Sequence, residues 1–345
     1  MGFQAGLQVD YLSRAECGSA RRADVLGVAT FNTTPAALFA ADVPVAEIGI
    51  PVLGASANVC EVWWTERHVE SGQRAGVRYR RDDNVLFGCI TLPETGVTPL
   101  VAGVNRSALY AATEQAYGEI FAMLDAVGFE HLLRVWNYLP QINVDTHGAE
   151  RYRQFNSARR EAFIACGRDV TDSVPAACTL GSETGSPLVI YFLASRAAPT
   201  LIENPRQISA YSYPPQYGPR PAFSRASVLH EAAGTRLFVS GTASIVGHHT
   251  VHAGDVAAQT REALVNIDAL LTEVNRVAGA TRLSLGTLAY KVYMRNSTDL
   301  PIIQAQLRSA LGSSARVVYL KADICRRDLL VEIEATGSHS FDADA

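Results

Sequence analysis

The sequence predicts an α+β protein in which one β-α-β-α-β-β unit occurs twice in tandem. Two observations support this pseudo-duplicated architecture: two amphipathic helical segments share their apolar pattern, and the segments around them follow the same order. In addition, 345 residues of which 48% are hydrophobic provide enough apolar side chains for about two globular domains.

The two amphipathic segments are the first helices of the two units. Residues 254–274, GDVAAQTREALVNIDALLTEV, place apolar side chains three and four positions apart, and Asp255 is a suitable N-cap. Residues 114–128, EQAYGEIFAMLDAVG, repeat this spacing at the same relative positions. Both segments are therefore predicted to be helices with one apolar face.

The flanking segments of the two units also correspond. Each helix lies between two apolar strands, and a second helix and a closing pair of strands follow. In the first unit these segments are residues 84–92, 132–143, 150–167 and 176–194, and in the second unit 236–245, 285–296, 299–312 and 315–335. We expect an N-terminal domain over residues 1–198, a C-terminal domain over residues 199–337 and a tail over residues 338–345.

The closing strand of the second unit carries two glutamates. In residues 324–337, ICRRDLLVEIEATG, alternate side chains point to opposite faces, so Glu332 and Glu334 share a face. This pattern alone is typical of a half-exposed edge strand with a solvated polar face. The alternative is a cleft in which one carboxyl acts as an acid.

The first unit differs at the matching positions. When LVIYFLA and LVEIEA are aligned from their final alanine, Tyr191 corresponds to Glu332 and Leu193 to Glu334. The first copy is thus apolar where the second is acidic. This asymmetry favours a cleft built by the second copy, with the first copy as scaffold.

The segment that joins the units is rich in proline, tyrosine and arginine. Residues 200–227, TLIENPRQISAYSYPPQYGPRPAFSRAS, could form a stiff polyproline spacer. They could equally form a rigid loop that presents guanidinium and phenol groups to a carboxylated ring substrate. The side chains that support the loop interpretation are Arg206, Tyr211, Tyr213, Tyr217, Arg220 and Arg225.

The composition excludes several classes of function. The net charge is −4 and lysine occurs only at Lys291 and Lys321, so nucleic acid is not an expected partner. We find no apolar run of the roughly 18 residues that a membrane span needs and no signal-peptide pattern at the start. We therefore expect a cytoplasmic protein without a membrane partner, as a monomer or small homo-oligomer.

Cysteine and histidine spacing gives no metal or disulfide motif. Six cysteines are scattered without a Cys-x-x-Cys pair, which indicates reduced and mostly buried thiols. His248, His249 and His252 could be metal ligands, but their spacing matches no strong motif, and a solvated loop is the favoured interpretation.

The second unit resembles the RidA/YjgF-like family of small domains. The resemblance is carried by LFVSGTAS, by GDVAAQTREALVNIDALL, by YKVYMRNSTDLPIIQAQL and by the closing strands. In that family a closing arginine and glutamate act on a small carboxylated molecule in a cleft. The matching residues here are Arg316 and Glu332.

From about residue 45 to 337, the whole chain resembles the chorismatase family. The segments RVWNYLPQIN, ERYRQFNSARREAF and ENPRQISAYSYPPQYGPRPAFSRAS occur in that family's order. Members release pyruvate from the enolpyruvyl ether of chorismate and form either a diol acid or a hydroxybenzoate. The resemblance implies two tandem RidA/YjgF-like (chorismate mutase-like) domains, chorismate as the substrate, and neither cofactor nor metal.

The resemblance also implies roles for individual residues. Glu332 matches the catalytic glutamate, which would protonate the terminal methylene of the enolpyruvyl group, while Glu334 is expected to be structural or exposed. Burial would have to raise the pKa of Glu332 for it to act at neutral pH. Ala158 stands where the family has a glycine before its arginine. The implied substrate-binding residues are Tyr152, Arg159, Tyr211 or Tyr213, Arg225 and, less directly, Arg316.

The resemblance also links Cys325 to the choice between a hydroxybenzoate and a diol product. Chorismate is isomeric with hydroxybenzoate plus pyruvate, whereas the diol needs a net water. The branch of the family that forms 3-hydroxybenzoate has Cys at the position of Cys325, with a small residue facing it, here Gly241 or Ala243; the hydrolytic branch has Ala. The resemblance therefore implies 3-hydroxybenzoate formation. Hydrolysis to 3,4-dihydroxycyclohexa-1,5-diene-1-carboxylate, or non-catalytic binding of a small molecule, are the alternatives.

Overall fold

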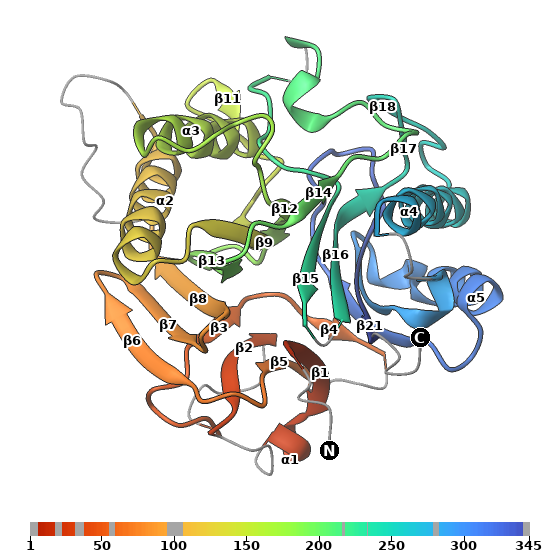
Figure 1. Ribbon diagram of the computed structural model, residues 1–345. Helices are drawn as coiled ribbons and strands as arrows, with labels where there is room; N and C mark the ends of the chain where they lie inside the picture. Colours follow the sequence, from red (N-terminus) through yellow and green to blue (C-terminus); the bar gives the residue numbers. More distant parts are fainter. Residues whose placement is uncertain are drawn as a thin grey trace.

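The computed structural model describes residues 6–17, 23–31, 38–54, 59–94, 106–215, 218–232, 234–278 and 283–340. In this part of the chain, three large β-sheets pack around a common centre, and the long helices α2, α3, α4 and α5 lie on the outside (Figure 1). Tyr217 and residues 341–345 of the expected tail lie outside the described residues.

The first unit is a six-stranded sheet that α2 and α3 cover on one face. The strand order is β12-β9-β13-β8-β7-β6. The elements are β6 (Glu70–Arg74), β7 (Val77–Arg81), β8 (Val85–Leu92), α2 (Ala108–Val127), β9 (His131–Pro140), α3 (Arg151–Ala165), β12 (Ala176–Ser182) and β13 (Leu188–Ser195). Ser107 caps α2 by accepting a hydrogen bond from the Tyr110 backbone, and Gly128 ends it in the left-handed conformation that suits glycine. A short hairpin of β10 (Asp145–Thr146) and β11 (Ala149–Glu150) precedes α3.

The second unit is a seven-stranded sheet that α4 and α5 cover on one face. The strand order is β14-β15-β16-β21-β19-β20-β4. The elements are β4 (Val52–Leu53), β14 (Thr200–Ile202), β15 (Ala226–Glu231), β16 (Gly234–Ala243), α4 (Val256–Ala278), β19 (Ala289–Met294), α5 (Leu300–Leu311), β20 (Arg316–Lys321) and β21 (Val331–Ser340). As predicted, Asp255 caps the helix, accepting a hydrogen bond from the Ala258 backbone at 2.9 Å.

The two units share their topology, which confirms the predicted fold class. In the first unit the order is β8-α2-β9-α3-β12-β13, and in the second it is β16-α4-β19-α5-β20-β21. The closing strands β13 and β21 pair antiparallel with both β8 and β9 in the first unit and with both β16 and β19 in the second. The third strand of each repeat pairs in parallel with the second, β12 with β9 and β20 with β19.

A third sheet, which the repeat did not predict, is formed by the N-terminal residues. Its strand order is β1-β5-β2-β3, with β1 (Gln8–Ser13), β2 (Val25–Phe31), β3 (Val45–Ile48) and β5 (Val59–Trp64); α1 (Arg14–Cys17) follows β1. The following strand β4 then joins the second unit's sheet beside β20. The division of the chain into two domains at residue 199 remains a proposal. Strand β4 comes from the N-terminal part of the chain but pairs within the sheet of the second unit.

The polar face of β21 is buried, so the edge-strand interpretation is wrong. β21 lies between β16 and β19 in the middle of its sheet. Val331 and Ile333 pack against α4 and α5, while Glu332 and Glu334 point toward the other two sheets and are 4% and 3% exposed. The same face of β13 points toward the same centre through Tyr191 and Leu193, as the alignment of the units predicted.

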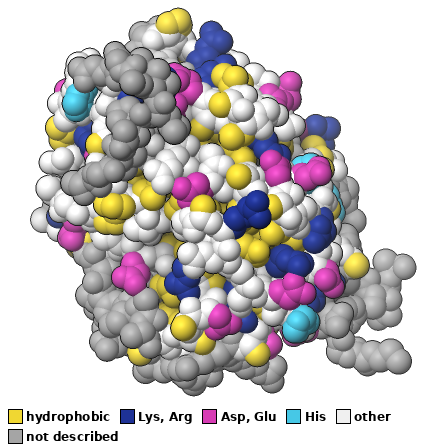
Figure 2. Space-filling model, turned by 90° about the vertical axis from the view of Figure 1, so that its left-hand side faces the viewer, with side chains coloured by type: hydrophobic (Ala, Val, Ile, Leu, Met, Phe, Trp, Pro, Cys, Tyr) yellow, Lys and Arg dark blue, Asp and Glu magenta, His cyan; other side chains and the backbone are white. Residues whose placement is uncertain are grey.

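The surface carries mixed charges. On the face shown in Figure 2, arginine and lysine side chains are interspersed with aspartate and glutamate, and no single-sign field covers it. This mixture agrees with the small net charge of −4. No helix among the described residues is long and apolar enough to cross a bilayer.

Packing between the N-terminal sheet and the first unit leaves no room at Gly27. A Cβ there would lie 2.0 Å from Cδ1 of Phe87, a buried ring stacked on Tyr191 at 5.8 Å. We expect Gly27→Ala to lower the free energy of unfolding by roughly 1 to 3 kcal/mol, because overpacking strains the core.

Urea unfolding measures this change, with Gly118→Ala in α2 as the matched control. A Cβ at Gly118 meets nothing within 4 Å, so the control should gain roughly 0.5 to 1 kcal/mol in helix propensity. Equal effects of the two substitutions would contradict the packing between these sheets.

Candidate active site

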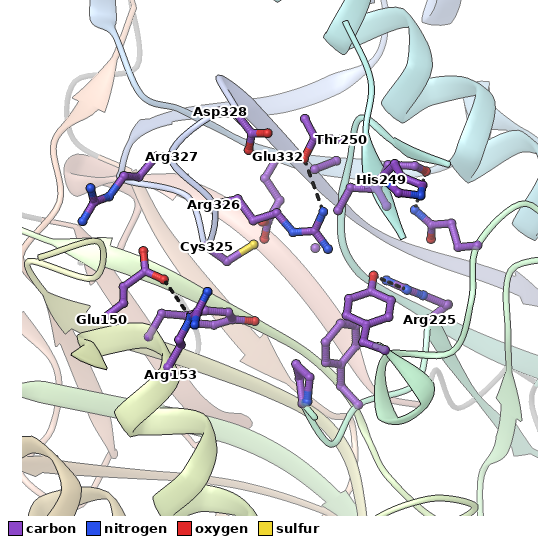
Figure 3. A pocket seen from close by; sticks show the side chains of 18 residues that line it. Glu150, Arg153, Arg225, His249, Thr250, Cys325, Arg326, Arg327, Asp328 and Glu332 are labelled. Carbon is purple, nitrogen blue, oxygen red and sulfur yellow. Dashed lines mark hydrogen bonds and ion pairs between the residues drawn. The ribbon is translucent and has the colours of Figure 1, made fainter. Parts of the chain in front are cut away.

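A cavity of about 430 Å³ opens between the two units, next to the closing strand β21. Its wall comes from the start of α3, the joining segment, the end of β16 and the loop before β21 (Figure 3). The size suits a small ring-shaped ligand. Its described lining residues are Glu150, Tyr152, Arg153, Gln207, Tyr213, Pro221, Phe223, Arg225, Gly241, Ala243, Ile245, His249, Thr250, Cys325, Arg326, Arg327, Asp328 and Glu332.

Glu332 is a buried carboxyl on the wall of this cavity. Burial, and then the negative charge of Glu334, raise the pKa of Glu332 to about 8, although Arg134 acts in the opposite direction. Among the described residues, none forms a hydrogen bond or ion pair with this carboxyl. Glu332 is therefore a protonated acid at neutral pH that faces a ligand-sized space.

A β-bulge makes room for the carboxyl of Glu332. The pairing of β16 with β21 shifts register between Val239 and Thr242, and Gly241 lies in this interval. A Cβ on Gly241 would lie 1.9 Å from Oε1 of Glu332 and 3.0 Å from Cβ of Cys178. Glycine at this position thus fixes where the carboxyl can lie.

Glu334 has a different environment from Glu332, although both lie on one face of β21. Its carboxylate accepts hydrogen bonds from Arg134 and from Trp136 Nε1 at 2.8 Å, and it pairs with Lys291 at 2.6 Å. Burial acts to raise the pKa of Glu334. Lys291 and Arg134 act in the opposite direction and together outweigh burial, so the pKa lies below its usual value. Glu334 is therefore ionised and buried, so of the two expected alternatives, structural or exposed, the structure agrees with the structural one.

Cys325 lies in the loop before β21, beside Glu332. Burial, reinforced by the Glu332 carboxyl, raises the pKa of the Cys325 thiol to about 12, so a neutral thiol faces the cavity. Arg295, just after β19, holds this loop through hydrogen bonds to the backbone oxygens of Leu329 at 3.0 Å and Ile324 at 3.1 Å. The Arg295 side chain therefore holds the loop that carries the thiol.

Arginines dominate the charge of the cavity wall. Arg225 donates through Nη2 to the Tyr213 hydroxyl at 2.8 Å, while its buried Nε has no hydrogen-bond partner among the described residues. Arg326 donates to the backbone oxygen of His248 at 2.9 Å, and Arg153 lies 3.9 Å from a carboxylate oxygen of Glu150 (Figure 3). Together these guanidinium groups suit a ligand that carries carboxylates.

Most of the predicted site residues meet at this cavity. Those that line it are Tyr152, Tyr213, Arg225, Gly241, Cys325 and Glu332, together with Ala243. They come from both units and from the joining segment. Because Tyr213 and Arg225 of residues 200–227 line the cavity, the structure agrees better with a loop that presents side chains to a site than with a simple spacer. Tyr211, two residues before Tyr213, does not line the cavity.

Two predicted arginines lie elsewhere. Arg159 is 1% exposed, and its guanidinium packs over the rings of Tyr117 and Phe163 at 5.2 Å, between α2 and α3. It shares a helix face with Tyr152 but lies two turns, or about 10 Å, further along α3. Arg316 is exposed at the start of β20. Neither residue is among those that line this cavity.

Sequence reasoning missed three arginines of the wall. Arg326 and Arg327 directly follow Cys325, and Arg153 directly follows Tyr152, so adjacency to a selected residue was the available signal. His249 also lines the cavity, while His252 contacts Glu262 at 3.3 Å. Within the described ranges, no group of three or more His, Cys, Asp or Glu could hold a metal ion.

Comparisons with known proteins agree on one family. Residues 61–194 match the family model described as Chorismatase FkbO/Hyg5-like, N-terminal. A 3-hydroxybenzoate synthase of Streptomyces hygroscopicus is 40% identical over 79% of this chain and 80% of its own length. A chorismatase of Streptomyces rapamycinicus is also 40% identical, over 80% of this chain and 81% of its own length. A chorismatase crystal structure covers 98% of this chain and 99% of its own length, at a TM-score of 0.85 and 31% identity.

The pKa of Glu332 should appear in the stability of the protein. Between the unfolded-state pKa near 4.5 and about 8, the unfolded chain releases this proton while the folded protein keeps it. Glu332 therefore destabilises the fold increasingly as pH rises through this window. We expect Glu332→Gln to gain stability relative to the wild type from pH 5 to pH 9, on the order of a few kcal/mol.

Urea unfolding at several pH values measures this difference. The control is Glu334→Gln, which removes the partner of two buried cations and should lose stability at neutral pH. A difference between Glu332→Gln and the wild type that does not change with pH would contradict a protonated Glu332.

Proposed function

This chain belongs to the chorismatase family, as its sequence resemblance predicted, and it is an enzyme that cleaves chorismate; on this premise we propose that it forms 3-hydroxybenzoate and pyruvate, with Glu332 as proton donor. The observation that carries this proposal is a carboxyl kept protonated at neutral pH on the wall of an arginine-lined cavity. A relative named 3-hydroxybenzoate synthase at 40% identity supports the product.

The cavity wall matches the charges of chorismate, which carries two carboxylates. Arg225 and Arg326 are the proposed carboxylate ligands, because each guanidinium is oriented by protein contacts before any ligand binds. Phe223, Tyr152 and Tyr213 provide an aromatic wall for the ring. Arg153 and Arg327 add positive charge at the same cavity, which attracts a dianion.

Glu332 is the proposed acid for the first chemical step. It donates its proton to the terminal methylene of the enolpyruvyl group, which leaves an oxocarbenium ion stabilised by the neighbouring ether oxygen. Its acidity is weak enough for the proton to be present at neutral pH. The ether bond to the ring then breaks with its electron pair on oxygen, so that pyruvate leaves and the ring carbon becomes cationic. The hydroxyl of the neighbouring ring carbon shifts onto this carbon, and the proton there returns to the Glu332 carboxylate, which gives aromatic 3-hydroxybenzoate and restores the acid.

Cys325 is the proposed determinant of the product. Hydroxybenzoate plus pyruvate contains the atoms of chorismate alone, whereas the diol requires one water more. A neutral thiol beside Glu332 occupies space at the acid that a water would need. Because the thiol stays protonated, its contribution is to exclude water and not to act as a base.

Chorismate turnover tests the proposal directly. The wild type should release pyruvate and 3-hydroxybenzoate in equal amounts, with a rate that falls as pH rises above about 8. Glu332→Gln, which keeps the size of the side chain but lacks the acid, should lower kcat by roughly 100-fold or more. Coupled pyruvate detection and chromatography of the products measure both. Wild-type protein that releases no pyruvate would overturn the proposed function, and near-normal turnover by Glu332→Gln would overturn the role of Glu332.

The product ratio tests Cys325 separately. We expect Cys325→Ala to keep chorismate consumption but to shift products toward the dihydroxycyclohexadiene carboxylate, because removal of the sulfur admits water. Cys166→Ala is the matched control, since Cys166 lies at the end of α3 and not at the cavity. Chromatography of the reaction mixture gives the ratio. The same ratio in both variants would remove Cys325 from product choice.

A further inference from the structure

A network of four buried charges lies behind Glu332. Arg134 and Lys291 hold Glu334, and Lys291 also pairs with Glu61 at 2.5 Å. The Tyr191 hydroxyl donates to Glu61 at 3.1 Å and accepts from Lys291 at 2.8 Å. The network therefore contains two cations and two anions, and its net charge is zero.

Two of the charged groups near Glu332 come from this network. On its own strand the charged neighbour is Glu334, and from β9 it is Arg134. Cys178 on β12, Cys325 in the loop and Tyr152 on α3 also face it, and burial raises the pKa of each, so they stay neutral. On the cavity wall that Glu332 shares, the charged side chains are those of Glu150, Arg153, Arg225, Arg326, Arg327 and Asp328. Among these groups, Glu334 is a negative charge that raises the pKa of Glu332.

Glu61 completes the network from outside the tandem units. It lies on β5 of the N-terminal sheet, where Trp63 Nε1 donates to it at 2.7 Å. Without Glu61, Lys291 would have a single counterion and the network would carry a net positive charge. A positive charge beside a buried carboxyl favours its ionised form.

We propose that Glu334 and Glu61 are positioning residues that keep the Glu332 carboxyl protonated through the charge balance of this buried network. The inference rests on the proposed role of Glu332 as the acid. It assigns a function to the N-terminal sheet, because β5 supplies the carboxylate that neutralises the second charge of the network.

The upper pH limit of chorismate turnover tests this proposal. Glu61→Gln should move the limit of kcat/KM to lower pH, because it leaves the network with one excess positive charge. Glu334→Gln should move it further, by about one pH unit or more, because Glu334 lies next to Glu332. The double variant Glu61→Gln/Lys291→Met removes one charge of each sign and should return the limit to within a few tenths of a unit of the wild-type value.

This design separates electrostatics from structural damage. Both Glu61 variants lose the same carboxylate, so a structural effect would persist or grow in the double variant, whereas the charge effect reverses. An unchanged limit in folded Glu61→Gln and Glu334→Gln, or no recovery in the double variant, would overturn the proposal. Circular dichroism at each pH shows which variants are folded. If one of the two single variants does not fold, the other still gives the direction in which the upper pH limit of kcat/KM moves.

A measurement without substrate keeps the two proposals distinguishable. Infrared difference titration of each protein against the same protein carrying Glu332→Gln reports the ionisation of the Glu332 carboxyl. A shift of this titration to lower pH in Glu61→Gln supports the proposed effect of the network on Glu332, even if the protein does not cleave chorismate. If chorismate is cleaved normally and the titration of the Glu332 carboxyl is unshifted in the variants, the proposed role of the network is overturned and the proposed function remains.

Discussion

The structure depends on the burial of four charges at the point where three sheets meet. Removing two cations and two anions from water is expensive unless each finds partners of the opposite sign with good geometry. Glu334 is paired with Arg134 and Lys291, and Glu61 closes the network from β5. The partners come from β5, β9, β19 and β21, so the charges can be satisfied only when the N-terminal sheet and both units are assembled.

The same network explains how two glutamates on one strand face differ in protonation. Burial is the larger cause that disfavours the charged form of Glu332, and the anion of Glu334 two residues away adds to it, so Glu332 keeps its proton. The bulge at Gly241 then lets this neutral carboxyl reach the cavity wall. One strand thus supplies a fixed charge for the interior and an acid for the cavity.

Local sequence patterns predicted the repeated elements that the two units share, because the helices and strands there carry clear apolar periodicities. They did not predict the additional strands β6 and β7 of the first unit or β4, β14 and β15 of the second. They also did not predict the N-terminal sheet, since β2 is buried on both faces and shows no alternation. The same limit applied to β21, whose alternating glutamates look solvated until Arg134 and Lys291 are known to lie opposite. At the site, the family resemblance selected residues by motif, and only packing could separate Tyr152 on the cavity wall from Arg159 under α2.

The asymmetry of the duplication has a physical reason in this arrangement. If the first copy also carried acids at Tyr191 and Leu193, two acidic faces would meet across the centre, and further cations would be needed. Instead, Tyr191 stacks on Trp136 at 4.5 Å and its hydroxyl bridges Glu61 and Lys291. The first copy therefore supplies both the apolar wall that strengthens the interaction between the charges and a polar contact that orients them.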